Sequence, residues 1–398
     1  MNVSGHVRKL KSNYYIVLEI NDNGKRSQKS LSVKKLMGPG RPAGAREARA
    51  LLRNILKEYE DGTFIEPTDI KVGKYLLGWL EYIKSQVETK TYEIYRNMVV
   101  NHLIPELGDI KLPNLRKSHI KKMIADKLKG GRMDEKEGGL SPRSVQYMFS
   151  ILKQALSQAV EDELIKKNVA EGVTPPKVKR PPIEYWSREE VQAFLSAISN
   201  YRLYPLYYTA LKTGLRRGEL LGLRWKDVSL EKKIITVRQS NVAIRGGSKL
   251  KTPKTASGFR TIEISDNLVK VLKSWGIRQK QEFLGEGRPE KDQGLVFTTK
   301  KGTKILPRNI NRHFDLIAGR LSAELRDKKG KIIRGPVLHK ISFHGLRHTF
   351  ATLAVEEGID MKTLAEILGH SNTAATDIYA HVTPRTRKAA AAATDGIF

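Results

Sequence analysis

The residues with the clearest chemical potential lie between positions 341 and 381. His344 and Arg347 are three residues apart, so a helix would bring both side chains to one face. His370 follows in a Leu-Gly-His sequence, and Tyr379 lies shortly after it. An arginine can hold a phosphate with two hydrogen bonds, an imidazole can move a proton, and a phenol can act as a nucleophile. Together these residue types suit a site that holds a phosphodiester and attacks it with tyrosine.

More charged residues with chemical meaning precede this segment. Arg216 and Glu219 belong to the sequence Thr-Gly-Leu-Arg-Arg-Gly-Glu. Lys254 lies in a basic hairpin between two candidate strands at 234–237 and 259–264. Two arginines can clamp the nonbridging oxygens of a phosphodiester, because each guanidinium is permanently charged and bidentate.

These motifs, in this order, resemble those of the tyrosine recombinases, also called the phage integrase family. The resemblance covers about residues 68–398. Residues 1–62 resemble, less closely, the arm-binding domain of integrases from phages and conjugative transposons. The resemblance implies an enzyme that integrates and excises a mobile element. It would cut through a 3′-phosphotyrosine intermediate, exchange strands through a Holliday junction, and work as a homotetramer on two double-stranded DNA sites of arm and core type.

The resemblance implies a catalytic set in which two arginines clamp the phosphate and a tyrosine attacks it. A free phenol has a pKa of about 10, so only about one part in 10³ is ionised at neutral pH. The site must therefore remove the phenolic proton or stabilise the phenolate. The six implied catalytic residues are Arg216, Lys254, His344, Arg347, His370 and Tyr379.

Proton transfer falls to two of these residues in the family pattern. His344 is the expected general base or proton relay, and Lys254 the general acid for the leaving 5′-hydroxyl. Simple phosphate contact is the alternative role for Lys254, and Lys249 and Lys251 are nearby competitors for the acid role. His370 is expected to hydrogen-bond the scissile phosphate.

Three residues beside the motifs are expected to act without touching DNA. Glu219 would buttress the arginines. His348 and His381 adjoin the motifs but match no family role, and we interpret both as structural. No metal is expected, because two histidines with an arginine do not make a zinc or magnesium site. Without a phosphate-binding glycine loop, ATP is not indicated either, so no cofactor is expected.

Composition agrees with a nucleic-acid partner. The 398 residues carry 72 Lys+Arg against 42 Asp+Glu, a net charge of +30. Such a surplus indicates a polyanion, with a ribosome-associated or merely highly charged surface as the alternative. Cysteine is absent, which excludes disulfides and thiolate catalysis and fits a reducing cytosol. We see no signal peptide and no membrane-length apolar stretch, so we expect a bacterial, cytoplasmic protein on DNA.

We expect a mainly α fold with small antiparallel β-sheets, in three domains. The first, residues 1–62, combines candidate strands at 14–20 and 26–33, joined by a turn at 21–24, with a helix at 43–59. It carries 13 Lys+Arg and 6 Asp+Glu, a surplus of +7, as an arm-type DNA-binding module would. Gly62 and Pro67 mark its end.

The next segment, residues 68–170, is predicted to be a helical core-binding domain. Four helices are expected in it. The first carries an apolar stripe from Val72 to Ile83, and the second runs from 90 to 103 and stops near Pro105. The third covers 118–129, and the fourth begins at Ser141-Pro142. A proline-rich basic linker, 171–185, leads to a mixed α/β catalytic domain, 186–398, which opens with a capping box from Ser187 to Glu190.

Two other functions remain open at this point. A type IB topoisomerase shares much of this catalytic set, although the two domains ahead of the catalytic one argue against it. A catalytically silent DNA-binding regulator is the second alternative, which the full set of catalytic residues disfavours. The sequence does not reveal the recognition sites, because base readout depends on few side chains and on DNA deformability. Nor does it reveal the overlap length, the host element or the need for a small directionality factor.

Overall fold

The computed structural model describes residues 2–22, 25–37, 44–66, 68–132, 137–179, 181–244, 246–253, 256–286, 294–324, 338–370 and 375–379. The chain divides into two compact units, Met1–Arg180 and Pro181–Phe398. Both are mainly helical and carry only small antiparallel sheets, so the predicted fold class is confirmed. Within the described residues, no helix is both long and apolar enough to cross a bilayer.

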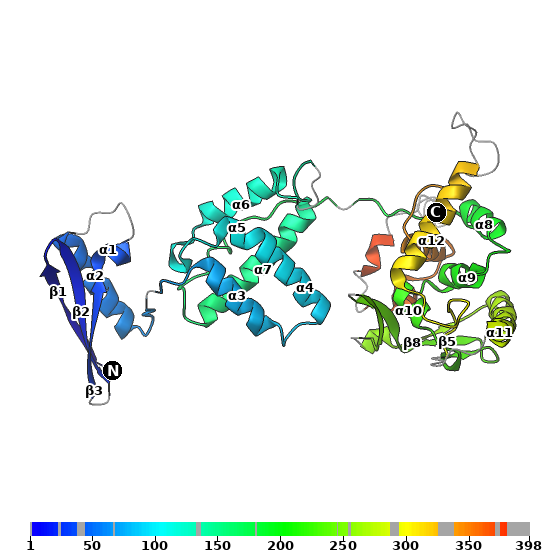
Figure 1. The fold of residues 1–398 in the computed structure, drawn as a ribbon, viewed down its shortest axis with the longest axis horizontal. Helices are drawn as coiled ribbons and strands as arrows, with labels where there is room; N and C mark the ends of the chain where they lie inside the picture. The colour runs from blue at the N-terminus through cyan, green and yellow to red at the C-terminus, as the bar shows by residue number, and fades with distance from the viewer. Residues whose placement is uncertain are drawn as a thin grey trace, which may run out of the picture. The chain divides into compact units, whose positions relative to one another are not determined.

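The first unit begins with a three-stranded antiparallel sheet in the order β1-β2-β3, against which a helix packs (Figure 1). Its elements are β1 (Asn2–Leu10), β2 (Asn13–Asp22), β3 (Lys25–Ser32), α1 (Val33–Met37) and α2 (Ala45–Glu60). The two predicted strands and the helix are present; residues 23 and 24 of the predicted turn lie outside the described residues. Strand β1 was not predicted, because one of its inward positions is Gly5 and its sequence contains only isolated apolar residues.

The rest of this unit is helical, as predicted. Its elements are α3 (Val72–Ile83), α4 (Thr89–Met98), the π-turn η1 (Val99–Leu103), α5 (Ile104–Leu107), the 3₁₀ turn η2 (Leu112–Asn114), α6 (Lys117–Lys129) and α7 (Pro142–Glu161). All six apolar residues of the α3 stripe are buried. Ser141 caps α7, with its hydroxyl accepting from the Ser144 amide at 3.1 Å.

The second helix stops near Pro105, as predicted, but four residues later than the expected end at residue 103. Helical backbone continues from α4 through η1 and α5 to Leu107. Pro105 lies in the first turn of α5, where a residue without an amide hydrogen does not cost an intrahelical hydrogen bond. The π-turn before it shifts the hydrogen-bond register, so the proline falls at the start of a segment instead of inside one.

The second unit combines helices with two small sheets, β4-β5-β8 and β6-β7. Helix α9 contacts α8, α11 and α13 (Figure 1). The elements are α8 (Arg188–Ala197), α9 (Tyr204–Thr213), α10 (Arg217–Gly222), η3 (Trp225–Asp227), β4 (Val228–Ser229), β5 (Ile234–Val237), β6 (Ser240–Ile244), β7 (Gly247–Lys251), η4 (Ala256–Gly258), β8 (Arg260–Glu263), α11 (Asp266–Glu286), α12 (Pro307–Glu324), α13 (Gly345–Glu356), α14 (Met361–Leu368) and η6 (Asp377–Tyr379).

The two predicted strands of this unit pair as β5 and β8, with Ile235 opposite Ile262. The basic hairpin between them starts earlier than predicted, because β6 pairs with β7, which carries Lys249 and Lys251. Lys254, beyond β7, lies outside the described residues.

An aromatic core holds the unit together and reaches the His-x-x-Arg motif. The rings of Trp186, Phe194, Tyr207 and Phe314 pack within about 6 Å of one another in successive pairs. Phe343 joins this cluster, with its ring centroid 5.8 Å from that of Phe314. Because Phe343 is 4% exposed and directly precedes His344, its burial fixes where the His-x-x-Arg motif begins.

Candidate active site

A left-handed glycine places Arg216. Helix α9 ends at Gly214, whose φ is +60°, and α10 then begins with Arg216 at its N-cap. A Cβ on Gly214 would lie 2.4 Å from a Phe350 ring carbon and 2.9 Å from a methyl carbon of Leu368. Glycine is therefore required both by its backbone conformation and by the closeness of α13 and α14.

Glu219 ties two arginines together, as predicted for Arg216. Its carboxylate accepts from Arg216 Nη1 at 2.8 Å and from the Arg216 amide at 2.9 Å. It also accepts from Arg260 Nη2 at 2.8 Å and Nη1 at 3.2 Å. Burial raises the pKa of Glu219, but hydrogen bonds and charge from Arg260, together with Arg216, outweigh burial and lower it below its usual value.

Arg347 is the most deeply buried cation of the site, at 3% exposure. Its Nη1 donates to the Gly214 carbonyl at 2.9 Å and its Nη2 to the Leu368 carbonyl at 2.8 Å. These carbonyls belong to the C-terminal ends of α9 and α14, where the helix dipole favours a cation. Burial, and then the charge of Arg216, lower the pKa of Arg347 to about 9, so the guanidinium stays protonated at neutral pH.

His370 reaches Arg347 through a second left-handed glycine, Gly369, which has φ +67°. The carbonyl of Gly369 accepts from Arg216 Nη2 at 2.9 Å. The Nε2 atom of His370 lies 2.9 Å from Arg347 Nη2, and its Nδ1 lies 2.8 Å from the Thr376 hydroxyl. Since a guanidinium only donates, Nε2 must accept, which leaves the proton on Nδ1. Burial and then Arg347 lower the pKa of His370 to about 4, consistent with a neutral ring.

Tyr379 is buried, with 1% exposure, and its hydroxyl lies 2.8 Å from His348 Nδ1. Burial raises the pKa of this phenol, while the charges of Arg347 and Arg216 act in the opposite direction. Both arginines are therefore within electrostatic reach of the phenolic oxygen.

His344 occupies the N-cap of α13, with Arg347 inside the helix. Its ring centroid is 4.8 Å from that of His348, in an edge-to-face arrangement. Burial, followed by the nearby His348 and Arg347, lowers the pKa of His344 to about 4. No hydrogen bond joins His344 to Tyr379 among the described residues; His348 lies between them.

The structure thus joins Arg347 to His370 directly, and Arg216 to the carbonyl of the neighbouring Gly369. It links Tyr379 to His344 through His348. Lys254 and His381 lie outside the described residues. Sequence reasoning missed the buried Arg260 and the contact between His348 and the tyrosine. The four-residue spacing of His344 and His348, one helical turn, was the available signal for the second.

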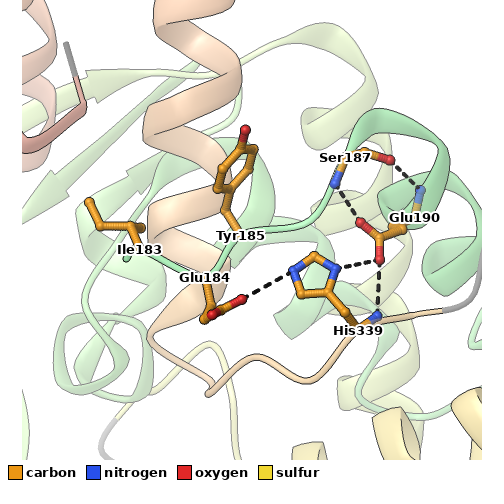
Figure 2. A pocket seen from close by; sticks show the side chains of 6 residues that line it. All are labelled: Ile183, Glu184, Tyr185, Ser187, Glu190 and His339. Atoms are coloured by element: carbon orange, nitrogen blue, oxygen red, sulfur yellow. Dashed lines mark hydrogen bonds and ion pairs between the residues drawn. The ribbon is translucent and has the colours of Figure 1, made fainter. Parts of the chain in front are cut away.

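A polar cluster anchors the segment that leads into α13 (Figure 2). Glu190 accepts from the Ser187 amide at 2.8 Å, completing the predicted capping box of α8. It also lies 2.7 Å from His339 Nδ1, and Glu184 lies 3.8 Å from Nε2 of the same ring. Together these residues line a pocket of about 300 Å³. Since its polar groups pair with one another, we interpret the cluster as a clamp that positions the following motif.

Comparison with known proteins agrees with this geometry. Residues 184–386 match the Phage integrase family, and residues 71–128 match the family's N-terminal SAM-like domain. A tyrosine recombinase XerC-like protein of Caldanaerobacter subterraneus is 29% identical over 374 residues, covering 89% of this chain and 90% of the relative. The ICEBs1 integrase of Bacillus subtilis is 29% identical over 275 residues, covering 68% of this chain and 70% of the relative.

Solved structures show the same fold. The Tn1549 transposon integrase, in complex with a circular intermediate DNA, has a TM-score of 0.66 at 22% identity, covering 82% of this chain and 99% of the solved one. A lambda integrase dimer bound to a core site has a TM-score of 0.55 at 18% identity, covering 79% and 97%. The family match alone spans about half of the sequence.

The chain therefore belongs to the phage integrase family and is a tyrosine site-specific recombinase. This assignment supports neither the topoisomerase alternative nor the silent regulator.

Proposed function

We propose that the protein integrates and excises a mobile element by cutting and rejoining double-stranded DNA with Tyr379. One observation carries the proposal: the buried hydroxyl of Tyr379 lies within electrostatic reach of Arg216 and Arg347. A phenol in such a setting is directed at an anionic centre, because guanidiniums favour both the phosphate and the developing phenolate.

The charge balance of the site favours a bound phosphodiester. The carboxylate of Glu219 is bonded to the guanidiniums of Arg216 and Arg260, and that of Arg347 lies within its electrostatic reach. Because both neighbouring histidines of the proposed catalytic set have pKa values of about 4, they add no charge at neutral pH. The described part of the site therefore holds an excess of positive charge that a phosphate would neutralise.

In the proposed reaction, Arg216 and Arg347 hold the nonbridging oxygens while the Tyr379 oxygen attacks phosphorus. The bond from phosphorus to the 5′-oxygen breaks, and Lys254 supplies a proton to the leaving hydroxyl. The phosphotyrosine bond keeps the energy of the cleaved diester, so a 5′-hydroxyl of the partner strand can reseal it through a Holliday junction. Loss of one arginine contact would slow cleavage by on the order of 10²–10³. His344 takes part in proton transfer, and His370 contacts the phosphate in this proposal.

The remaining parts of the chain serve DNA binding and assembly in this proposal. The helical domain, 68–170, and the linker, 171–185, grip the core site together with the catalytic domain, 186–398. Residues 1–62 bind arm-type sites. Lambda integrase has been solved as a tetramer on a Holliday junction, at a TM-score of 0.53 and 17% identity, which supports a homotetramer on DNA for this chain. A small directionality factor would select between integration and excision.

The decisive experiment is covalent trapping. The protein is incubated with fragmented DNA of its source genome, denatured, and recovered with its covalently attached DNA, which is then sequenced. We expect few, recurrent junctions carrying a 3′-phosphotyrosine. The matched variant Tyr379→Phe should bind DNA equally well and give no adduct, because it loses only the hydroxyl. An undiminished adduct with the variant would place the nucleophile elsewhere, and junctions without site preference would favour a topoisomerase.

A further inference from the structure

The hydroxyl of Tyr379 already has a hydrogen-bond partner, and this partner is not the histidine of the family pattern. His348 Nδ1 lies 2.8 Å from the phenolic oxygen. The two rings are 5.7 Å apart between centroids and inclined at 51°, so the contact is made by the polar atoms and not by stacking. Because burial raises the pKa of the phenol, Tyr379 keeps its proton and can donate it to Nδ1 of the neutral His348 tautomer that carries its own proton on Nε2.

The surroundings of this hydrogen bond exclude other proton acceptors among the described residues. Tyr379 packs in an apolar cluster that includes Ala351, Leu364 and Leu368. The titratable groups that face His348 are His344 and Arg347 on α13 and Tyr379 on η6. Of these, only the tyrosine is hydrogen-bonded to His348. Burial and then the charge of Arg347 lower the pKa of His348, which favours the neutral ring, the form that can accept a proton.

We propose that His348 is a catalytic residue that accepts the phenolic proton of Tyr379 during DNA cleavage. As the bond from the Tyr379 oxygen to phosphorus forms, the hydroxyl proton moves along the existing hydrogen bond to Nδ1. The bond from phosphorus to the 5′-oxygen breaks, and the 5′-oxygen keeps the electron pair of that bond and takes a proton from the general acid of the proposed reaction. His348 becomes an imidazolium next to the new phosphotyrosine. In the resealing step a 5′-hydroxyl attacks phosphorus and gives its proton back to the general acid. The bond from phosphorus to the Tyr379 oxygen breaks, and the proton on His348 returns to the tyrosine oxygen.

The position of His344 explains why two histidines are present on this face. His344 lies one turn earlier, with its ring against His348 and no hydrogen bond to the phenol among the described residues. Through this edge-to-face contact it can orient the His348 ring. In this arrangement His344 is a positioning residue for His348, and the direct acceptor is the histidine that touches the reacting oxygen.

The proposal rests on the proposed function, and wild-type adduct formation is therefore measured first. Once a site has been identified by trapping, single-turnover cleavage of a nicked duplex is followed from pH 5 to 9. His348→Gln keeps a polar side chain but cannot accept a full proton. We expect it to bind DNA normally and to cleave about 10²–10⁴ times more slowly, the usual share of general base catalysis.

A fluorinated tyrosine at position 379, which has a more acidic phenol, separates this role from a structural one. It should partly restore cleavage in His348→Gln, because a more acidic phenol ionises without a base, and should restore none in the matched variant His344→Gln. In the otherwise unaltered protein, fluorination should leave the acidic limb of the pH–rate profile in place, because that limb reports the histidine.

The outcomes are distinguishable. No adduct with wild-type protein refutes the proposed function itself. If the wild-type protein forms an adduct, three results overturn the assignment of His348. These are undiminished cleavage by His348→Gln, equal or no rescue by the fluorinated tyrosine in both variants, and rescue of His344→Gln alone. If His348→Gln fails to bind DNA, the test uses the protein that carries fluorinated tyrosine at position 379 and no other change. If the acidic limb of its pH–rate profile moves with the phenol pKa, the proposal is overturned.

Discussion

Glu219 is the residue on which the arginine cluster most depends, and replacing it with glutamine tests this. Its side chain and that of Arg260 are only 8% and 7% exposed, and they are joined at 2.8 Å. Removing one charge of such a buried pair costs about 3–5 kcal/mol, since the other charge stays buried without compensation. The amide of Glu219→Gln still accepts a hydrogen bond, and Arg260 keeps its bond to the Ile367 carbonyl, so we expect the lower end, about 3 kcal/mol.

This loss is measurable as thermal unfolding. For a unit of this size it corresponds to a fall in Tm of about 6–12 °C. Differential scanning calorimetry of the full chain should show the shift in the transition of the second unit only. Glu263→Gln is the matched control, because Glu263 lies exposed on the same strand as Arg260. A Tm for Glu219→Gln equal to that of the control would refute the reasoning.

The same variant has a defined pH dependence. The pKa of Glu219 is lowered in the folded protein by Arg260 and Arg216, against the effect of burial. A carboxyl with a lowered folded pKa contributes stability that is fully present above its unfolded pKa of about 4.3 and is lost as the pH falls through the folded pKa. The Tm difference between wild type and Glu219→Gln should therefore be constant near neutral pH and shrink below about pH 4.

Two further predictions concern the backbone and the first module. Gly214→Ala should destabilise the second unit by more than about 2 kcal/mol in calorimetry, because residue 214 has a left-handed φ and its new Cβ would lie 2.4 Å from Phe350. Gly247→Ala is the control, because a Cβ at residue 247 would meet nothing within 4 Å. A chain lacking residues 1–62 should lose its footprint on arm-type sites while still cleaving short core-site duplexes, and arm binding by the full chain should fall steeply with salt; cleavage lost together with the footprint would contradict the domain assignment.

Much of the fold could be predicted from local patterns. The α3 stripe, the Ser141 cap and the β5–β8 pair follow from periodicity and capping, which act over a few residues. Strand β1 was missed because it is stabilised by pairing with β2 and by the close approach of α2 to Gly5, and neither is visible in its own composition. The end of the second helix was predicted too early, because a proline ends a helix only where its missing amide hydrogen costs a hydrogen bond, and Pro105 lies in the first turn of α5.

The candidate site, too, could be predicted from the sequence only in part. The order of motifs predicted Arg216, Arg347, His370 and Tyr379 as site residues. In the structure Arg347 meets His370, Arg216 meets the adjacent Gly369 carbonyl, and both arginines lie within electrostatic reach of Tyr379. Arg260 could not be found, since a strand arginine becomes a buried partner of Glu219 only when β8 packs beside α10. The carbonyls that hold the arginines come from helix ends, and sequence order alone does not reveal that these ends converge.

The choice between His344 and His348 shows the limit of motif reasoning most clearly. Their spacing puts both imidazoles on one helical face, so the sequence offers two proton acceptors and the family pattern selects the first. Which ring meets the phenol depends on where η6 lies against α13, a long-range contact that local sequence does not encode. In this structure that contact brings the tyrosine to the second histidine, one turn further from the helix start. The proton pathway of this site is therefore set by how the segment carrying the nucleophile packs.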